Sequence, residues 1–232
     1  MLYTQSPLPQ TKAALLALLG KGKKRPLGVD IHYPSRGQTS VQELYETRLG
    51  KIFLKRVSER NHKDCQINPV YGTLAEREAW CSRLAQTIGL DVPDLRLLDE
   101  STTVQKWLNL SDAHTYSTTL GKMTFEAENV FECALFDWVT GQIDRHDANY
   151  LYDYVNQKII LIDSAHSLLK HTGSLPDYLK LYEFSEVQNL NRALATKIST
   201  RFKKISPEQM LTNIPLRNDQ EKQALLDRHA QI

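Results

Sequence analysis

Three oxygen-bearing side chains near the middle of the chain have the types and the spacing of a magnesium–nucleotide site. Asp144 and Asn149 stand five residues apart in the stretch Ile143-Asp144-Arg145-His146-Asp147-Ala148-Asn149, and Asp163 follows further along. Mg²⁺ prefers hard oxygen ligands and commonly takes only one or two side chains besides substrate phosphates. We therefore expect Asn149 and Asp163 to bind the metal, and Asp144 to orient an attacking hydroxyl.

A β-hairpin is predicted between Asn149 and Asp163. Tyr150 to Tyr154 is rich in aromatic residues, Lys158 to Ile162 is rich in β-branched residues, and the residues between them are polar. Such runs on either side of a short polar stretch are typical of paired strands. If the hairpin folds symmetrically about Asn156, Asn149 lies opposite Asp163, and the amide oxygen lies beside the carboxylate.

The step from Asp144 to Asn149, followed by a metal-binding Asp after a hairpin, is the pattern of protein-kinase-like enzymes. The letters Asp144-Arg145-His146 and Ile162-Asp163-Ser164-Ala165-His166 resemble the atypical branch. That branch holds the phosphatidylinositol 3-/4-kinase-like enzymes and the HipA-like bacterial kinases. The resemblance implies an α+β, bilobal protein-kinase-like fold that uses ATP and Mg²⁺ or Mn²⁺. The alternative is that Asp-Arg-His-Asp is only a charged loop.

Lys55 is the candidate phosphate-binding lysine. Val41 to Glu46 and Lys51 to Val57 are predicted as two strands, and strand alternation puts Lys55 on the same face as Phe53. A lysine on a buried face needs an anionic partner, which ATP phosphates and a helix glutamate would supply. In the alternative interpretation, Lys55 ends an edge strand in solvent.

A helix that begins at a Thr73–Glu76 capping box and stops at Gly89 supplies the candidate glutamate. At about 100° per residue, Glu78 falls on the border of its apolar stripe, where it could meet Lys55. Arg77 also falls near the stripe. The helix and its Gly-Leu-Asp-Val-Pro exit resemble the HipA-like kinases, and this resemblance implies that Glu78 holds Lys55 in its phosphate-binding pose.

Two further segments are candidates for nucleotide contacts. The stretch from Pro34 to Ser40 could let backbone N–H groups approach phosphates, although it could also be a plain turn; its candidate residues are Gly37, Thr39 and Ser40. Strands are predicted over 95–98 and 104–108. In a kinase-like fold the second leads into the hinge that binds adenine, which we place at Lys106, Trp107 and Leu108. Trp107 could equally belong to the core.

Composition sets the remaining bounds. The chain has 232 residues, 41% hydrophobic and 24% charged, with a net charge of +2, so no polyanionic partner is required. Three widely spaced cysteines suggest a reducing compartment. The apolar run Ala13 to Leu19 is too short to span a bilayer and is predicted to be a helix that packs on the body of the protein. We expect a cytoplasmic protein, or one delivered into another cell.

Two lobes are expected, an N-lobe over 1–108 and a C-lobe over 109–232. In the second, helices are predicted over 124–141, 187–202 and 219–230. His146 could touch phosphate or bond the backbone of its own loop. Asp147 could be solvated or lie beside the metal, and His114, His166 and His171 look incidental.

The function that these residues favour is a minimal atypical protein serine/threonine kinase, such as a toxin, an effector or a modifying enzyme. A phosphoinositide-type lipid kinase is the alternative within the same fold. A nucleotide-binding pseudokinase, or a nucleic-acid-binding protein that uses the basic clusters 21–25 and 201–204, is the alternative from another class. A protein substrate or a lipid headgroup would be the acceptor, and no stable nucleic-acid binding is expected.

Overall fold

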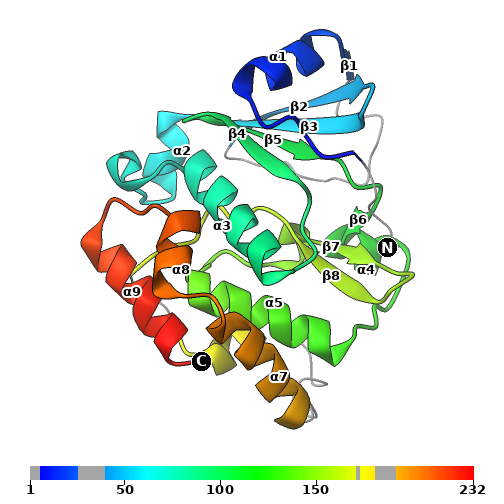
Figure 1. Cartoon of the computed structure of the whole chain (residues 1–232). Coiled ribbons are helices and arrows are strands. Elements are labelled where there is room, and N and C mark those ends of the chain that lie inside the picture. Colours follow the sequence, from blue (N-terminus) through cyan, green and yellow to red (C-terminus); the bar gives the residue numbers. More distant parts are fainter. Residues whose placement is uncertain (1–5, 26–39, 171–172, 181–191) are drawn as a thin grey trace.

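The computed structural model describes residues 6–25, 40–170, 173–180 and 192–232. The first part of the chain forms a five-stranded antiparallel sheet in the order β1-β2-β3-β5-β4 (Figure 1). Its strands are β1 (Lys23–Arg25), β2 (Ser40–Thr47), β3 (Gly50–Val57), β4 (Leu95–Asp99) and β5 (Thr102–Lys106). The hairpin expected over 41–57 is therefore confirmed, with Arg48 and Leu49 as its turn.

The two faces of this sheet are covered by different helices. Ile52 and Leu54 of β3 pack with apolar residues of α1 (Lys12–Gly20), which lies above the sheet in Figure 1. Val57, on the other face, packs with the first turn of α3 (Leu74–Ile88) below the sheet. Because side chains alternate along a strand, Lys55 shares the face of Val57 and points toward α3.

The ends of α3 follow from local chemistry, as the sequence predicts. Thr73 and Glu76 form the expected capping box, which satisfies two N–H groups of the first turn. Gly89 ends the helix in the left-handed conformation that glycine adopts without steric cost. Before the cap, Gly72 has a φ of +127°, and a Cβ there would meet the ring of Trp80 at 2.7 Å. Only glycine suits that turn.

The second part of the chain is mainly helical, around a small antiparallel sheet in the order β6-β7-β8. The long helix α5 (Ala127–Thr140) lies at its centre and is largely buried. The strands are β6 (Ser111–Asp112), β7 (Tyr150–Asp153) and β8 (Lys158–Leu161). The helices are α4 (Ala113–Thr119), α5 (Ala127–Thr140), α6 (Leu175–Lys180), α7 (Arg192–Lys203), α8 (Pro207–Asn213) and α9 (Asp219–Ala230). A short α2 (Glu59–Asp64) precedes α3.

Some predicted boundaries were wrong. The helix expected from residue 124 begins at Ala127, because Thr124 is held outside it by Tyr152, whose hydroxyl bonds both the N–H and the C=O of Thr124. The strand expected over 104–108 runs over Thr102–Lys106. The helix expected from 187 is described from Arg192, and 187–191 lie outside the described residues.

No helix in the described part of the chain is both long and apolar enough to cross a bilayer.

Candidate active site

Four of the residues singled out from the sequence line one cavity. Lys55, Glu78, Asn149 and Asp163 surround it, and they come from β3, α3 and the two ends of the β7–β8 hairpin. The rest of the lining consists of Gln42, Phe53, Gln105, Ala148 and Ile162. The sheet, the helix and the hairpin therefore converge on one group of ionisable and amide side chains.

Lys55 lies between two carboxylates. Its Nζ is 2.5 Å from Asp163 Oδ1 and 3.6 Å from Glu78 Oε1. The side chains of Lys55 and Glu78 are almost wholly buried, whereas that of Asp163 is 39% exposed. Thr103, on the neighbouring strand β5, donates a further hydrogen bond to Glu78. The lysine is therefore not a solvated strand end, which was the alternative.

Burial and charge act against each other on this triad. Burial would lower the pKa of Lys55, but the carboxylates of Asp163 and Glu78 outweigh it and the net pKa is raised. Burial raises the pKa of Glu78, and Lys55 only partly offsets this because Asp163 repels a second negative charge. Burial also acts to raise the pKa of Asp163, but the adjacent Lys55 lowers it overall. Asp163 is thus the more firmly ionised carboxylate.

The register of the β7–β8 hairpin differs by one residue from the predicted one. Tyr150 pairs with Leu161, so Asn149 lies opposite Ile162, whose N–H donates to the Asn149 carbonyl. The loop spans the four residues 154–157, so the hairpin has no single central residue. The carboxylate of Asp153 accepts the N–H groups of 155 and 156 and fixes this loop.

A one-residue slip reverses the faces on which the side chains of a strand lie, yet Asp163 still reaches the cavity. It lies just beyond β8 and has a φ of +50°, a left-handed conformation that Asp tolerates better than most residues. This local change of backbone direction redirects its carboxylate toward Lys55.

Arg145 anchors the loop that carries Asp144. It forms a two-pronged ion pair with Asp137 of α5, and both side chains are fully buried. Its Nη1 donates to the carbonyls of Asn149 and Ile162, and its Nη2 donates to Ser164 Oγ. A planar guanidinium suits such several-fold recognition. One buried side chain therefore holds the loop and both ends of the hairpin in register.

Gln142 adds a second link across the site. Its amide nitrogen donates to the Asp163 carbonyl, and its amide oxygen accepts the N–H of Asp144, each at 3.1 Å. Asn149 Nδ2 donates to the Asp144 carbonyl at 2.7 Å, so the Asn149 oxygen is the atom of that amide suited to a cation. The side chains of Gln142 and Asn149 thus tie the backbones of Asp144 and Asp163 to the hairpin.

Asp144 does not line the cavity itself but lies beside it, with a half-exposed side chain. Its Oδ2 is 3.3 Å from His166 Nδ1, and His166 Nε2 is 2.7 Å from Cys65 Sγ. Burial raises the pKa of Cys65, and the charges of Asp144 and Asp163 raise it further. His166, which was expected to be incidental, thus contacts Asp144, and its position three residues after Asp163 was the available signal for this contact. His171 lies outside the described residues.

Two other polar residues of the loop, His146 and Asp147, do not line the cavity. His146 Nδ1 accepts the N–H of Ala148, in agreement with the second of the two roles considered for it. Asp147 pairs with His114 at 3.0 Å, and both side chains are about half exposed. Asp147 is thus on the solvated side of the loop.

Two residues of the predicted hinge, Lys106 and Trp107, bond to other parts of the chain. The N–H groups of Lys106 and Trp107 donate to the carbonyls of Asp94 and Lys51, and Lys106 Nζ bonds the Leu49 carbonyl. The ring of Trp107 packs on Phe53, which lines the cavity, so Trp107 belongs to the core behind it.

The other predicted nucleotide contacts are placed only in part. Leu108 packs on Ile162 at the hairpin. Gly37 and Thr39 lie outside the described residues, and Ser40 is the first residue of β2.

Comparisons with known proteins bear on the fold. No protein-family model and no curated protein sequence matches the chain. Among solved structures, it is similar to a proinflammatory kinase of Helicobacter pylori, CtkA, with a TM-score of 0.52 and 12% sequence identity. The alignment covers 84% of this chain and 88% of that one. The chain thus has a bilobal, kinase-like α+β fold, as its sequence predicts.

Proposed function

We propose that the chain is an ATP-dependent phosphotransferase that acts on a hydroxyl group. The observation that carries this proposal is the convergence of Lys55, Glu78, Asn149 and Asp163 on one cavity, with Asp144 beside it, in a kinase-like fold. Phosphoryl transfer depends mainly on positioning and charge neutralisation, and this group of side chains offers both.

Each residue has a defined role in the proposed reaction. Lys55 binds the α- and β-phosphates of ATP, and Glu78 holds the lysine in place from the buried side. The oxygen of the acceptor hydroxyl bonds to the γ-phosphorus, and Asp144 accepts the proton that this hydroxyl loses. The bond between that phosphorus and the bridging oxygen breaks, and ADP leaves with the bonding electrons.

The donors present fit a magnesium or manganese ion. Asp163 offers a carboxylate that Lys55 keeps ionised, and Asn149 offers an amide oxygen. Hard oxygens of this kind, together with phosphate oxygens, would suit such an ion. The ion, when bound, would neutralise phosphate charge. We assign Asp163 and Asn149 to hold it. Asp163 would then give up its ion pair with Lys55 and bind the metal instead.

A protein serine or threonine is the acceptor that we favour. The helix of Glu78 and its exit resemble the HipA-like kinases, and the similar structure is also a kinase. The Asp144-Arg145-His146 motif resembles lipid kinases as well, so an inositol headgroup is the acceptor to test beside proteins.

The decisive experiment incubates the protein with ATP labelled on its γ-phosphate, Mg²⁺ or Mn²⁺, and protein or lipid acceptors. Asp163→Asn and Asp144→Asn should each lower transfer by about 10²-fold or more, as expected for loss of a charge-positioning or proton-accepting group. Asp147→Asn is the matched control, because it removes a carboxylate from the same loop that faces solvent and His114. Full activity in both test variants would refute the assignment.

A nucleotide-binding scaffold without turnover is the second candidate. It is favoured by the direct ion pair between Lys55 and Asp163, which a metal-bound nucleotide has to displace. Stabilisation by Mg-ATP without transfer to any acceptor would select this candidate.

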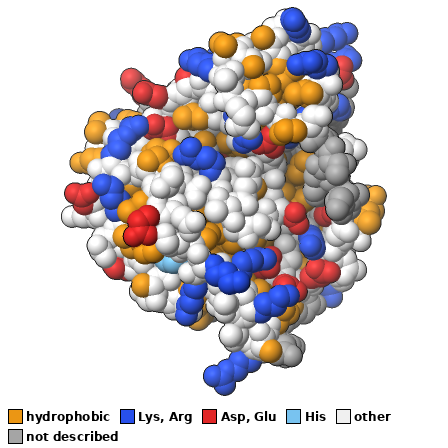
Figure 2. All heavy atoms as spheres, in the orientation of Figure 1, with side chains coloured by type: hydrophobic (Ala, Val, Ile, Leu, Met, Phe, Trp, Pro, Cys, Tyr) orange, Lys and Arg blue, Asp and Glu red, His pale blue; other side chains and the backbone are white. Residues whose placement is uncertain are grey.

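Nucleic-acid binding has less support. Lys24 and Arg25 pair with acidic residues of β2, and Arg201 pairs with Glu132. Figure 2 shows basic side chains at the top of the molecule, in the region of α1 and β1, and toward α7, with acidic side chains among them.

A further inference from the structure

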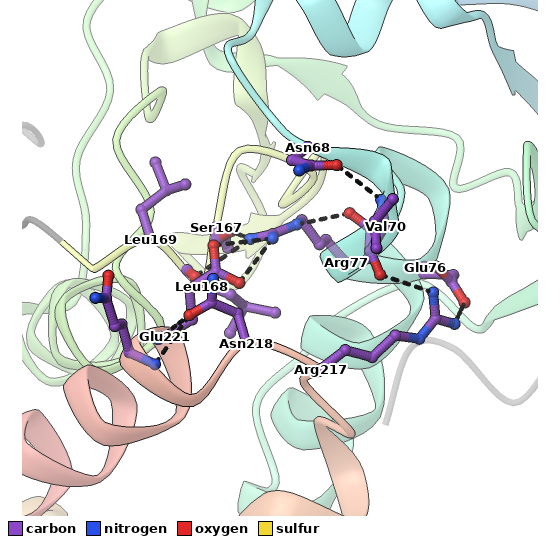
Figure 3. Close-up of polar contacts among 12 residues, drawn as sticks. Asn68, Val70, Glu76, Arg77, Ser167, Leu168, Leu169, Arg217, Asn218 and Glu221 are labelled. Carbon is purple, nitrogen blue, oxygen red and sulfur yellow. Dashed lines mark hydrogen bonds and ion pairs between the residues drawn. The ribbon is translucent and has the colours of Figure 1, made fainter.

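Arg77, which follows Glu76 and precedes Glu78 on α3, is a buried hub that the phosphotransfer scheme does not use. Only 1% of its side chain is exposed. Its Nη2 donates to both carboxylate oxygens of Glu221 of α9, at 2.9 and 3.0 Å. Its Nε donates to the Gly72 carbonyl at 3.0 Å. Figure 3 shows Arg77 at the centre of these contacts, between α3 and the chain that enters α9.

The remaining donors of Arg77 hold the segment that follows Asp163. Nη1 donates to the carbonyls of Ser167 and Leu168, at 2.9 and 3.2 Å (Figure 3). Leu168 has a φ of +69°, a conformation that is strained for a leucine. Its N–H donates to the Thr140 carbonyl. The bend at Leu168 is therefore held from both sides.

α9 reinforces this arrangement at two further points. Arg217, just before α9, pairs with Glu76 at 2.6 Å, so the same link grips the first turn of α3 (Figure 3). Arg228, further along α9, donates to the carbonyls of Val139 and Leu169. Thus α9 and the residues before it contact α3 and the 163–169 segment together.

Adjacent residues of a helix point about 100° apart. Glu78 faces Lys55 in the cavity, while Arg77 faces α9. Movement of α3 would therefore alter both contacts at once. A displaced α3 would carry Glu78 away from Lys55. The same displacement would break the hydrogen bonds from Arg77 to the carbonyls of Ser167 and Leu168, which follow Asp163.

We propose that Arg77 and Glu221 are positioning residues for phosphotransfer. In this proposal α9 acts through them, and through the Arg217–Glu76 pair, as a brace that keeps Glu78 on Lys55 and Asp163 in the cavity. This inference rests on the proposed function for its catalytic consequence. Its physical core, the coupling of α9 to α3 and to the 163–169 segment, can be measured without any turnover.

Glu221→Gln is the test variant, because it keeps the size of the side chain and removes the charge that faces Arg77. We expect kcat to fall by about tenfold or more, as small misplacements of reacting groups commonly cause, with the KM for the acceptor unchanged. Amide hydrogen exchange, followed by mass spectrometry, should become faster in 74–88 and in 163–169 but not in the β7–β8 hairpin.

Lys222→Gln is the matched control. It also removes one charge from the first turns of α9, but Lys222 pairs only with Asp219 of its own helix among the described contacts. It should match the unmodified protein in kcat and in exchange. A role confined to overall stability would instead make exchange faster in every segment of the Glu221→Gln protein, and that result would overturn the proposal.

Arg217→Gln decides the case if Glu221→Gln does not fold, because Arg217 is half exposed and its removal leaves the buried pair intact. A selective increase of exchange in 74–88 supports the brace, and exchange equal to that of the unmodified protein contradicts it. If the unmodified protein transfers no phosphate at all, the proposed function fails. The exchange pattern then still supports or contradicts the brace.

Discussion

The ionisation of Glu78 and Asp163 depends on Lys55, because this one cation lies beside both carboxylates. With Lys55 removed, the buried Glu78 has no cationic partner at 3.6 Å, and Asp163 loses the group that lowers its pKa. An unpaired buried carboxylate is costly, and such a site responds by taking up a proton. The sign of the resulting pH dependence follows from these two pKa directions.

Lys55→Met should lower the free energy of unfolding by about 3 kcal/mol near pH 7.5 and by less near pH 5. In the unmodified protein, the lowered pKa of Asp163 gives stability that is present above its unfolded-state pKa and is lost as the pH falls through the folded-state value. In the variant both carboxylates have higher pKa values. As the pH rises through those values, the two carboxylates become charged without a partner and the folded variant loses stability. As the pH falls, protonation removes this cost.

Urea denaturation at the two pH values measures the difference. Lys106→Met is the control, because this buried lysine bonds the Leu49 carbonyl and not a carboxylate. Its loss should cost the same at both pH values. An equal cost at both pH values for Lys55→Met would contradict the charge assignment.

The sequence was informative about single residues where one element determines their direction. Strand alternation sufficed to place Lys55, and helical periodicity sufficed for Glu78. It was not informative where the partner is distant. Arg77 was visible only as a charge near an apolar stripe, because Glu221 lies 144 residues away along the chain. Arg145 could be recognised only as part of a motif, because its ion-pair partner Asp137 lies within α5 and the sequence gives no sign of the pair.

At the scale of elements, α3 was predicted to within a residue because its ends are set by local hydrogen bonds. The β7–β8 hairpin was predicted as an element but not in its register. Aromatic and β-branched runs identify strands, whereas the loop depends on a carboxylate of Asp153 that accepts two N–H groups beyond the strand. The alternation of strand residues does not by itself fix that contact, which is a turn preference of Asp.

Thr73→Ala should destabilise the protein by about 1–2 kcal/mol, because the cap of α3 is lost. Thr73 Oγ1 accepts the N–H of Glu76 and donates to the Glu100 carbonyl, so it fixes the start of the helix to the β4–β5 turn. Since Glu78 lies in the next turn, transfer activity should fall as well.

Thr87→Ala is the control for this prediction, and urea unfolding is the measurement. Thr87 lies near the end of the same helix, is exposed, and donates to the Arg83 carbonyl. Surface substitutions of this kind change stability by about 0.5 kcal/mol or less. Equal effects of the two substitutions would mean that the cap does not hold α3.

At the scale of the molecule, the cavity joins the sheet and α3 to the hairpin of the helical part. A ligand bound there contacts both parts at once and stabilises the whole folded chain. At a concentration of 100 times its Kd, a ligand adds about 2.7 kcal/mol, which for a chain of this size corresponds to a rise in Tm of about 5–10 °C. ATP with Mg²⁺ should produce this rise in the unmodified protein.

The dependence of this rise on the metal separates the roles of the two charged groups. Asp163→Asn should abolish the part of the Tm rise that needs Mg²⁺ and keep the smaller rise caused by ATP alone, because Lys55 still meets the phosphates. Lys55→Met should lose both parts. Asp147→Asn should behave like the unmodified protein, since its carboxylate faces His114. If ATP gives the same rise with and without Mg²⁺ in the unmodified protein, Asp163 and Asn149 do not hold a metal, and the cavity binds the nucleotide through Lys55 alone.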